Sequence, residues 1–257
     1  MSVPMTPVRS LVPRAADDPV TGALAVAAVT GALGALLSHR ANWPGAHVLA
    51  GWLAYALLGG TVLALASVRL GRARFGLANQ VTLLRSGLVC LAGGALVASG
   101  HSPIMSWSLA GLIAAALALD AVDGWLARRL RLVSSFGARF DLEVDALLLL
   151  ILALLVWRAH QVAGWVLAIG LLRYGFVLAG RALPWLGAPL PPSRGRKAIC
   201  VQQGVTLLIC LLPPVTPALA SALAALALTA LILSFARDVY WLTRQAGTTS
   251  RMLPEHA

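Results

Sequence analysis

The sequence predicts an all-α integral membrane protein with about eight transmembrane helices. Of its 257 residues, 59% are hydrophobic and only 11% are charged, whereas soluble domains carry roughly 25% charged residues. The mean hydropathy is +0.84, and apolar segments follow one another along most of the chain. Disordered, collagen-like and coiled-coil proteins are excluded, because each needs a polar or periodic composition that this chain lacks.

Eight apolar segments approach the roughly 20 residues that a membrane span requires. They cover residues 20–38, 47–68, 79–99, 103–121, 137–157, 161–181, 198–213 and 217–236. The first lacks a clear small-residue cleavage site, so we interpret it as an uncleaved span rather than a signal peptide. Four prolines between residues 184 and 193 predict an irregular linker before the seventh segment.

Eleven of the 20 Lys and Arg residues gather in alternate loops between these segments. They are Arg69, Arg72, Arg74, Arg128, Arg129, Arg131, Arg194, Arg196, Lys197, Arg237 and Arg244. The loops at residues 100–102 and 213–217 contain no Lys or Arg. The positive-inside rule therefore places both termini and the basic loops in the cytoplasm. We attribute the net charge of +11 to topology and anionic lipid, and expect no nucleic-acid partner.

Five of the nine acidic residues lie between Asp120 and Asp145. Asp120 and Asp123 share one helix face at the end of the fourth segment, and Asp141 and Asp145 share another near the start of the fifth. Glu143 points to a different helix face, and we do not include it in the site. Four facing carboxylates require positive charge between them. Arginines could supply some of this charge, but an all-oxygen ligand set selects a hard divalent cation such as Mg²⁺ or Mn²⁺. The sequence therefore predicts a site for two such ions.

Two motifs carry a resemblance to a known family. The first consists of Asp120, Asp123, Gly124, Ala127, Arg128, Gly137, Asp141 and Asp145. Their spacing resembles the signature D-x2-D-G-x2-A-R-x8-G-x3-D-x3-D of the CDP-alcohol phosphotransferases. The second consists of Asn79, Thr82 and Arg85, which resemble the N-x-x-T-x-x-R segment of the family's first core helix.

The resemblance implies three regions. Residues 1–72 would be an N-terminal extension with two transmembrane helices, residues 73–237 the family's six-helix core, and residues 238–257 a cytoplasmic tail. A homodimer is implied as well. We expect a multi-pass protein of the bacterial inner membrane, with its active site facing the cytoplasm.

The resemblance also implies an activity and residue roles. The family transfers a phosphoalcohol, typically the phosphatidyl group of CDP-diacylglycerol, to an acceptor hydroxyl and releases CMP. Asp120 and Asp141 resemble the ligands of both metal ions, Asp123 the ligand of one, and Asp145 the ligand of the other and the general base. The residues that resemble the family's contacts to the CDP part of the donor are Asn79, Thr82, Arg85, Gly124, Arg128 and Ser134.

The acceptor and two other functions stay open from the sequence. Arg173 within the sixth segment, with Arg194, Arg196 and Lys197 in the following linker, suits a phosphate-bearing acceptor such as glycerol 3-phosphate. However, residues 195–202 only partly resemble the corresponding segment of phosphatidylglycerophosphate synthases. A cation-coupled transporter could also use membrane carboxylates, although these cluster at one membrane face. Transfer of a CDP-linked alcohol to diacylglycerol is a further alternative.

Overall fold

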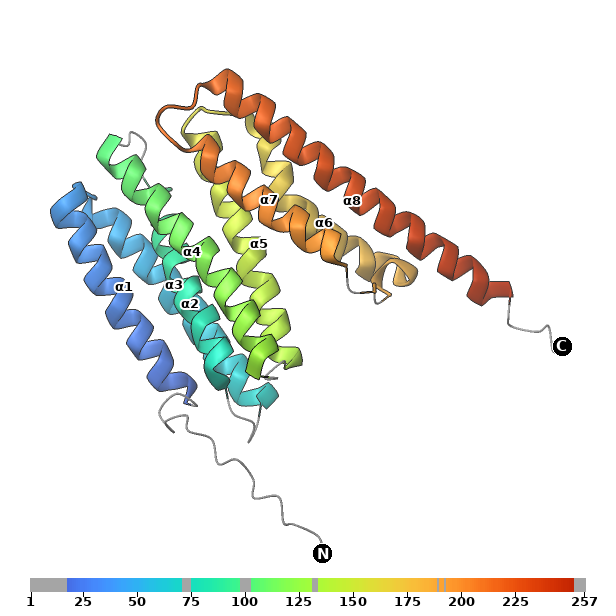
Figure 1. The fold of residues 1–257 in the computed structure, drawn as a ribbon. Helices are drawn as coiled ribbons and strands as arrows, with labels where there is room; N and C mark the ends of the chain where they lie inside the picture. The colour runs from blue at the N-terminus through green and yellow to red at the C-terminus, as the bar shows by residue number, and fades with distance from the viewer. Residues whose placement is uncertain are drawn as a thin grey trace, which may run out of the picture.

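The chain folds into eight α-helices and two short 3₁₀ turns, with no β-strand among the described residues (Figure 1). This computed structural model describes residues 18–70, 75–97, 103–130, 134–188, 190–191 and 193–251, without the side chains of residues 69–70, 103, 123–130, 184, 194 and 246–251. The helices are α1 (Pro19–Ala41), α2 (Gly45–Leu70), α3 (Gly76–Gly94), α4 (Pro103–Leu130), α5 (Ser135–Arg158), α6 (Leu167–Ala182), α7 (Arg194–Cys210) and α8 (Pro217–Arg251). The predicted all-α fold is confirmed.

Two helices continue well beyond the predicted apolar segments. α4 extends to Leu130 and α8 to Arg251, whereas the segments end at residues 121 and 236. The predicted ends followed hydropathy, but neither extension contains a proline that would stop the helix. The linker predicted to be irregular also begins with a 3₁₀ turn, Pro184–Gly187.

Side-chain caps define the start of several helices. The carboxylate of Asp18 accepts hydrogen bonds from the hydroxyl and backbone N–H of Thr21 at the start of α1, and these bonds lower the pKa of Asp18. The Ser134 hydroxyl accepts from the backbone N–H of Gly137 at 2.9 Å and caps α5. Ser193 caps α7 in the same way.

α3 is the central helix of the first half, because it packs against α1, α2, α4 and α5. Its contact with α2 is unusually close. A Cβ atom on Gly94 would lie 2.0 Å from the backbone oxygen of His47, and one on Gly51 would lie 2.7 Å from the Cα of Leu91. Small residues of this kind let two helix backbones approach in a membrane protein. They fix α3 in the position from which it reaches the acidic residues of α4 and α5.

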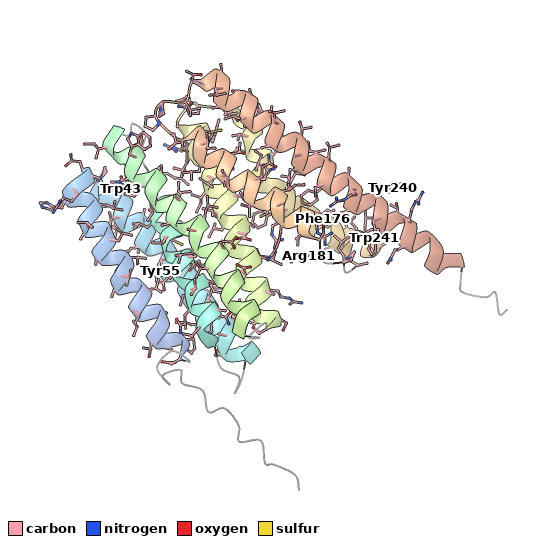
Figure 2. All side chains as sticks on the ribbon, in the orientation of Figure 1. Trp43, Tyr55, Phe176, Arg181, Tyr240 and Trp241 are labelled. Atoms are coloured by element: carbon pink, nitrogen blue, oxygen red, sulfur yellow. The ribbon has the colours of Figure 1, made fainter. Side chains whose placement is uncertain are left out.

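Hydrogen bonds between helices complete the packing. The indole Nε1 of Trp43 donates to the Ser108 hydroxyl of α4 at 2.7 Å, and the Tyr55 hydroxyl of α2 donates to the carbonyl of Ala23 in α1 at 3.0 Å. Figure 2 labels the side chains of Trp43 and Tyr55. In the second half, the buried Gln203 of α7 donates to the backbone of α8. α7 also contacts α4 and α5, so it connects α8 to these two earlier helices.

The surface of the protein exposes large apolar side chains, whereas a soluble protein buries most of them. Large apolar side chains such as Leu24, Leu57 and Leu226 are 67%, 76% and 69% exposed. Five helical segments are long and apolar enough to cross a membrane: Pro19–Ala41, Gly45–Val68, Ile104–Val122, Gly164–Ala182 and Pro217–Gln245. The chain is therefore a multi-pass membrane protein.

Three helices fall outside that set of five, and they are more polar or shorter. α3 contains Arg85, α5 contains Asp141 and Asp145, and α7 has 17 residues. Two of them, α3 and α5, thus carry three of the four charged residues of the site, and Asp120 lies in α4.

Candidate active site

Three of the four predicted aspartates converge between two helices. Asp120 comes from α4, while Asp141 and Asp145 come from α5, one helical turn apart. One oxygen from each carboxylate lies within 4.8 Å of the others. The side chains are 28%, 34% and 24% exposed, so the cluster is half-buried yet accessible. The side chain of Asp123 lies outside the described residues.

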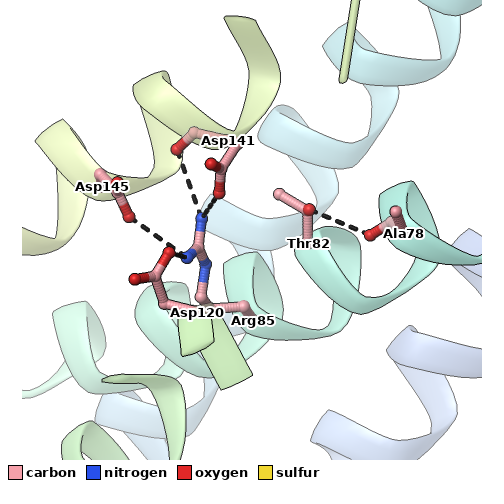
Figure 3. Close-up of polar contacts among 6 residues, drawn as sticks. All are labelled: Ala78, Thr82, Arg85, Asp120, Asp141 and Asp145. Atoms are coloured by element: carbon pink, nitrogen blue, oxygen red, sulfur yellow. Dashed lines mark hydrogen bonds and ion pairs between the residues drawn. The ribbon is translucent and has the colours of Figure 1, made fainter. Parts of the chain in front are cut away.

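A fully buried arginine occupies the centre of this cluster (Figure 3). Arg85 Nη1 pairs with Asp120 Oδ1 and, at 3.2 Å, with Asp145 Oδ1. Its Nη2 pairs with Asp141 Oδ1 and also donates to the backbone carbonyl of Asp141 at 3.3 Å. The guanidinium of α3 therefore binds all three carboxylates. The sequence pointed to Arg85 only through its resemblance to a donor contact, and these ion pairs were missed.

The other two residues of the upstream motif lie on the same helix. The amide of Asn79 donates to the carbonyl of Phe75 at 2.6 Å, and the Thr82 hydroxyl donates to the carbonyl of Ala78 at 3.1 Å. Both side chains are buried. A Cβ atom on Gly137 of α5 would lie only 2.4 Å from Asn79 Oδ1. The glycine in the signature thus allows α5 to pass close to the start of α3.

The remaining donor residues can be placed only in part. Ser134 lies just before α5 and uses its hydroxyl as the helix cap. Gly124 and Arg128 belong to α4, but their side chains lie outside the described residues.

Two of the predicted acceptor residues, Arg173 and Arg196, have acidic partners that were not predicted from the sequence. Arg173 Nη2 of α6 pairs with Glu143 Oε1 of α5 at 3.0 Å. The side chain of Arg173 is 31% exposed and that of Glu143 is 62% exposed. Arg173 Nε is buried and has no hydrogen-bond partner in the described part of the chain. Glu143 lies on a different helix face from Asp141 and Asp145 and so was not predicted as part of the site. The opposite charge of Arg173 on the next apolar segment could have indicated this ion pair.

Among the basic residues near the linker, Arg196 has an acidic partner. Arg196 Nη1 pairs with Asp238 Oδ1 of α8 at 3.1 Å, and Nη2 donates to the carbonyl of Pro191. Arg196 thereby joins the linker to α8. Lys197 is exposed, and the side chain of Arg194 lies outside the described residues.

The donor atoms of the cluster fit a hard divalent cation. Carboxylate oxygens are the ligands that Mg²⁺ and Mn²⁺ prefer, and three of them lie close together here. The same three carboxylates surround the positive charge of the Arg85 guanidinium. Asp120, Asp141 and Asp145 could therefore hold a metal ion. The prediction of two ions depends in addition on Asp123.

Comparison with known protein families agrees with this geometry. A family model described as CDP-alcohol phosphatidyltransferase matches residues 75–236, which is more than half of the chain. The match begins just before α3 and ends within α8, so it includes every residue of the aspartate cluster and Arg85. Searches of curated proteins and of solved structures gave no match to the chain.

Proposed function

The chain belongs to the CDP-alcohol phosphatidyltransferase family and is a transferase, and from this premise we propose that it makes a membrane phospholipid. The donor is CDP-diacylglycerol, the acceptor is an alcohol, and CMP is released. The observation that carries the proposal is the convergence of Asp120, Asp141 and Asp145 within the matched region.

The reaction balances without any redox partner. The acceptor oxygen forms a bond to the phosphorus of the phosphatidyl group, and the bond between that phosphorus and the CMP oxygen breaks. The acceptor hydroxyl loses its proton in the process. Bound Mg²⁺ or Mn²⁺, which we propose as two ions, would neutralise the diphosphate charge of the donor.

Individual residues supply the remaining functions. Asp145 is proposed as the general base that takes the acceptor proton, because a carboxylate at the site can accept it directly. Asp120, Asp123 and Asp141 complete the ligand set. The residues proposed to contact the CDP part of the donor are Asn79, Thr82, Arg85, Gly124, Arg128 and Ser134.

The membrane arrangement follows from the helices and the charges. We propose that all eight helices cross the bilayer or enter it, with the site at the cytoplasmic face. Residues 1–72 form an extension, residues 73–237 form the core and residues 238–257 form the tail, whose first part continues α8 to Arg251. A homodimer in a bacterial inner membrane remains part of this proposal.

The acceptor is proposed to carry a phosphate. Arg173 has a buried Nε atom without a partner among the described residues, and an Nη2 atom bound only to a largely exposed carboxylate. A phosphate group could replace the Glu143 carboxylate at Nη2, because guanidinium and phosphate form charge-assisted hydrogen bonds. Glycerol 3-phosphate is a simple acceptor of this class.

A prediction for Arg173 follows. Arg173→Ala should raise KM for a phosphorylated acceptor about 10- to 100-fold, since a hydrogen bond to a charged group contributes about 1.5–3 kcal/mol. KM for CDP-diacylglycerol should stay the same. The two values come from steady-state CMP release with each substrate varied in turn.

Arg158→Ala is the matched control, because this exposed arginine lies at the far end of α5. It should leave both KM values unchanged. An unaltered acceptor KM in Arg173→Ala would show that Arg173 only pairs with Glu143.

The acceptor class itself is tested by product analysis. Purified protein is incubated with CDP-diacylglycerol and Mg²⁺ or Mn²⁺, and with glycerol 3-phosphate, inositol phosphate, inositol, serine or choline. Formation of one new phospholipid together with CMP identifies the acceptor. A product from an uncharged alcohol alone would contradict the phosphate-bearing class but not the transfer.

A further inference from the structure

Arg85 lies among the three aspartates that could hold a metal ion. Its side chain is 0% exposed, and its two Nη atoms contact carboxylate oxygens of Asp120, Asp141 and Asp145. The three aspartates come from α4 and α5 and the arginine from α3. One cation thus connects three helices at a single point.

The charge balance explains why an arginine is suited to this place. Three carboxylates whose oxygens lie within 4.8 Å repel one another strongly when ionised. A guanidinium is always protonated in proteins, and its planar fork can donate to several carboxylates at once. It therefore offsets part of the repulsion when no metal is bound.

A divalent cation would bind to carboxylates that already contact Arg85. Asp120 Oδ1, Asp141 Oδ1 and Asp145 Oδ1 are each directed at Arg85, and two cations held by the same carboxylates repel each other. The positive charge of Arg85 would therefore disfavour a metal ion at this site. The free energy of the ion pairs then opposes metal binding, as in any competition for one site.

We propose that Arg85 is a positioning residue that holds the three carboxylates together without metal and competes with divalent cations for them. The inference rests on the metal-dependent function proposed above. It assigns Arg85 a role toward the metal centre, in addition to the donor contact that the family resemblance implies.

The test compares Mn²⁺ affinity in Arg85→Met with that of the unaltered protein. Methionine replaces the aliphatic stem of arginine but has no charge, so the variant has no cation that repels the metal. Isothermal titration of detergent-purified protein with Mn²⁺ should show at least about fivefold tighter binding in the variant, because an ion pair of about 1 kcal/mol corresponds to about a fivefold change in affinity. A merely structural role predicts weaker binding or no change.

Thermal stability provides a second readout. In EDTA, Arg85→Met should unfold at a lower temperature than the unaltered protein, because its carboxylates are uncompensated. Added Mn²⁺ should raise the unfolding temperature more in the variant than in the unaltered chain. An equal or smaller increase in the variant would overturn the proposal.

Two further variants keep the test decisive. Arg139→Met removes an exposed positive charge from the same end of α5. Its Mn²⁺ affinity shows the effect of removing any nearby positive charge, and Arg85→Met must bind Mn²⁺ more tightly than Arg139→Met does. Arg85→Lys keeps a positive charge but loses the planar, forked guanidinium. Its Mn²⁺ affinity should therefore lie between that of the unaltered protein and that of Arg85→Met. If Arg85→Met folds only in Mn²⁺, the competition is supported. If it folds in neither condition, the Arg85→Lys titration decides, with unchanged or weaker affinity overturning the proposal.

The two proposals fail in distinguishable ways. If the unaltered protein binds no Mn²⁺, the metal centre and the proposed function fail together. If the unaltered protein binds Mn²⁺ but Arg85→Met binds it no more tightly, only the role of Arg85 fails.

Discussion

Replacing Asp145 with asparagine is expected to lower CMP release by about 10³-fold or more while the protein remains folded in the membrane. A general base contributes about 10²- to 10⁴-fold to a reaction, and Asp145 is also part of the carboxylate cluster. Asparagine has nearly the same shape, but its amide cannot take the acceptor proton. The rate is measured as CMP formed per enzyme with saturating donor, acceptor and metal.

Folding is followed separately, by gel filtration and by the unfolding temperature in detergent. The matched control is Asp18→Asn, which makes the same chemical change at the exposed cap of α1. Asparagine caps helices about as well as aspartate, so this variant should retain full activity. If folded Asp145→Asn protein kept a tenth or more of the activity, Asp145 would not be the base.

A large loss of stability is expected from a single methyl group on Gly94. The added Cβ of Gly94→Ala would lie 2.0 Å from the carbonyl oxygen of His47 and 2.9 Å from the backbone nitrogen of Gly51. Both atoms belong to the backbone of α2, so no side chain can rotate away and the two helices must separate. Overpacking of this kind costs about 1–3 kcal/mol, which corresponds to an unfolding temperature lowered by about 2–12 °C in a chain of this size.

Gly60→Ala supplies the comparison, because a Cβ atom at Gly60 meets nothing within 4 Å. This change in α2 should leave the unfolding temperature the same or slightly higher, since alanine favours a helix over glycine. Equal unfolding temperatures for Gly94→Ala and Gly60→Ala would refute the close backbone contact between α2 and α3.

The fold class could be predicted because apolar composition and segment length determine it. All eight apolar segments correspond to helices of the structure, and five of them are long and apolar enough to span a membrane. α4 and α8 continue beyond the predicted spans because hydropathy marks the membrane boundary and not the end of a helix. Polar residues such as Asp123 and Arg244 continue a helix without difficulty.

The aspartates of the site could be predicted from their spacing, but the cations that pair with the acidic residues could not. Aspartates three or four residues apart must share a helix face, which is why Asp141 and Asp145 could be placed together. Which cation faces them depends on helix packing, and the Gly94 and Gly51 contacts that set the position of α3 leave no periodic signal. The ion pair between Glu143 and Arg173 was missed for the same reason, since it joins residues 30 positions apart.

The most direct test of the account is whether CMP release from CDP-diacylglycerol depends on a divalent metal ion. Purified protein should form CMP and a new phospholipid in equal amounts when donor, acceptor and Mg²⁺ or Mn²⁺ are all present. EDTA should abolish both products, and excess metal should restore them. CMP formation that persists in EDTA, or its absence with every acceptor from folded and metal-loaded protein, would contradict metal-dependent phosphatidyl transfer at the aspartate cluster.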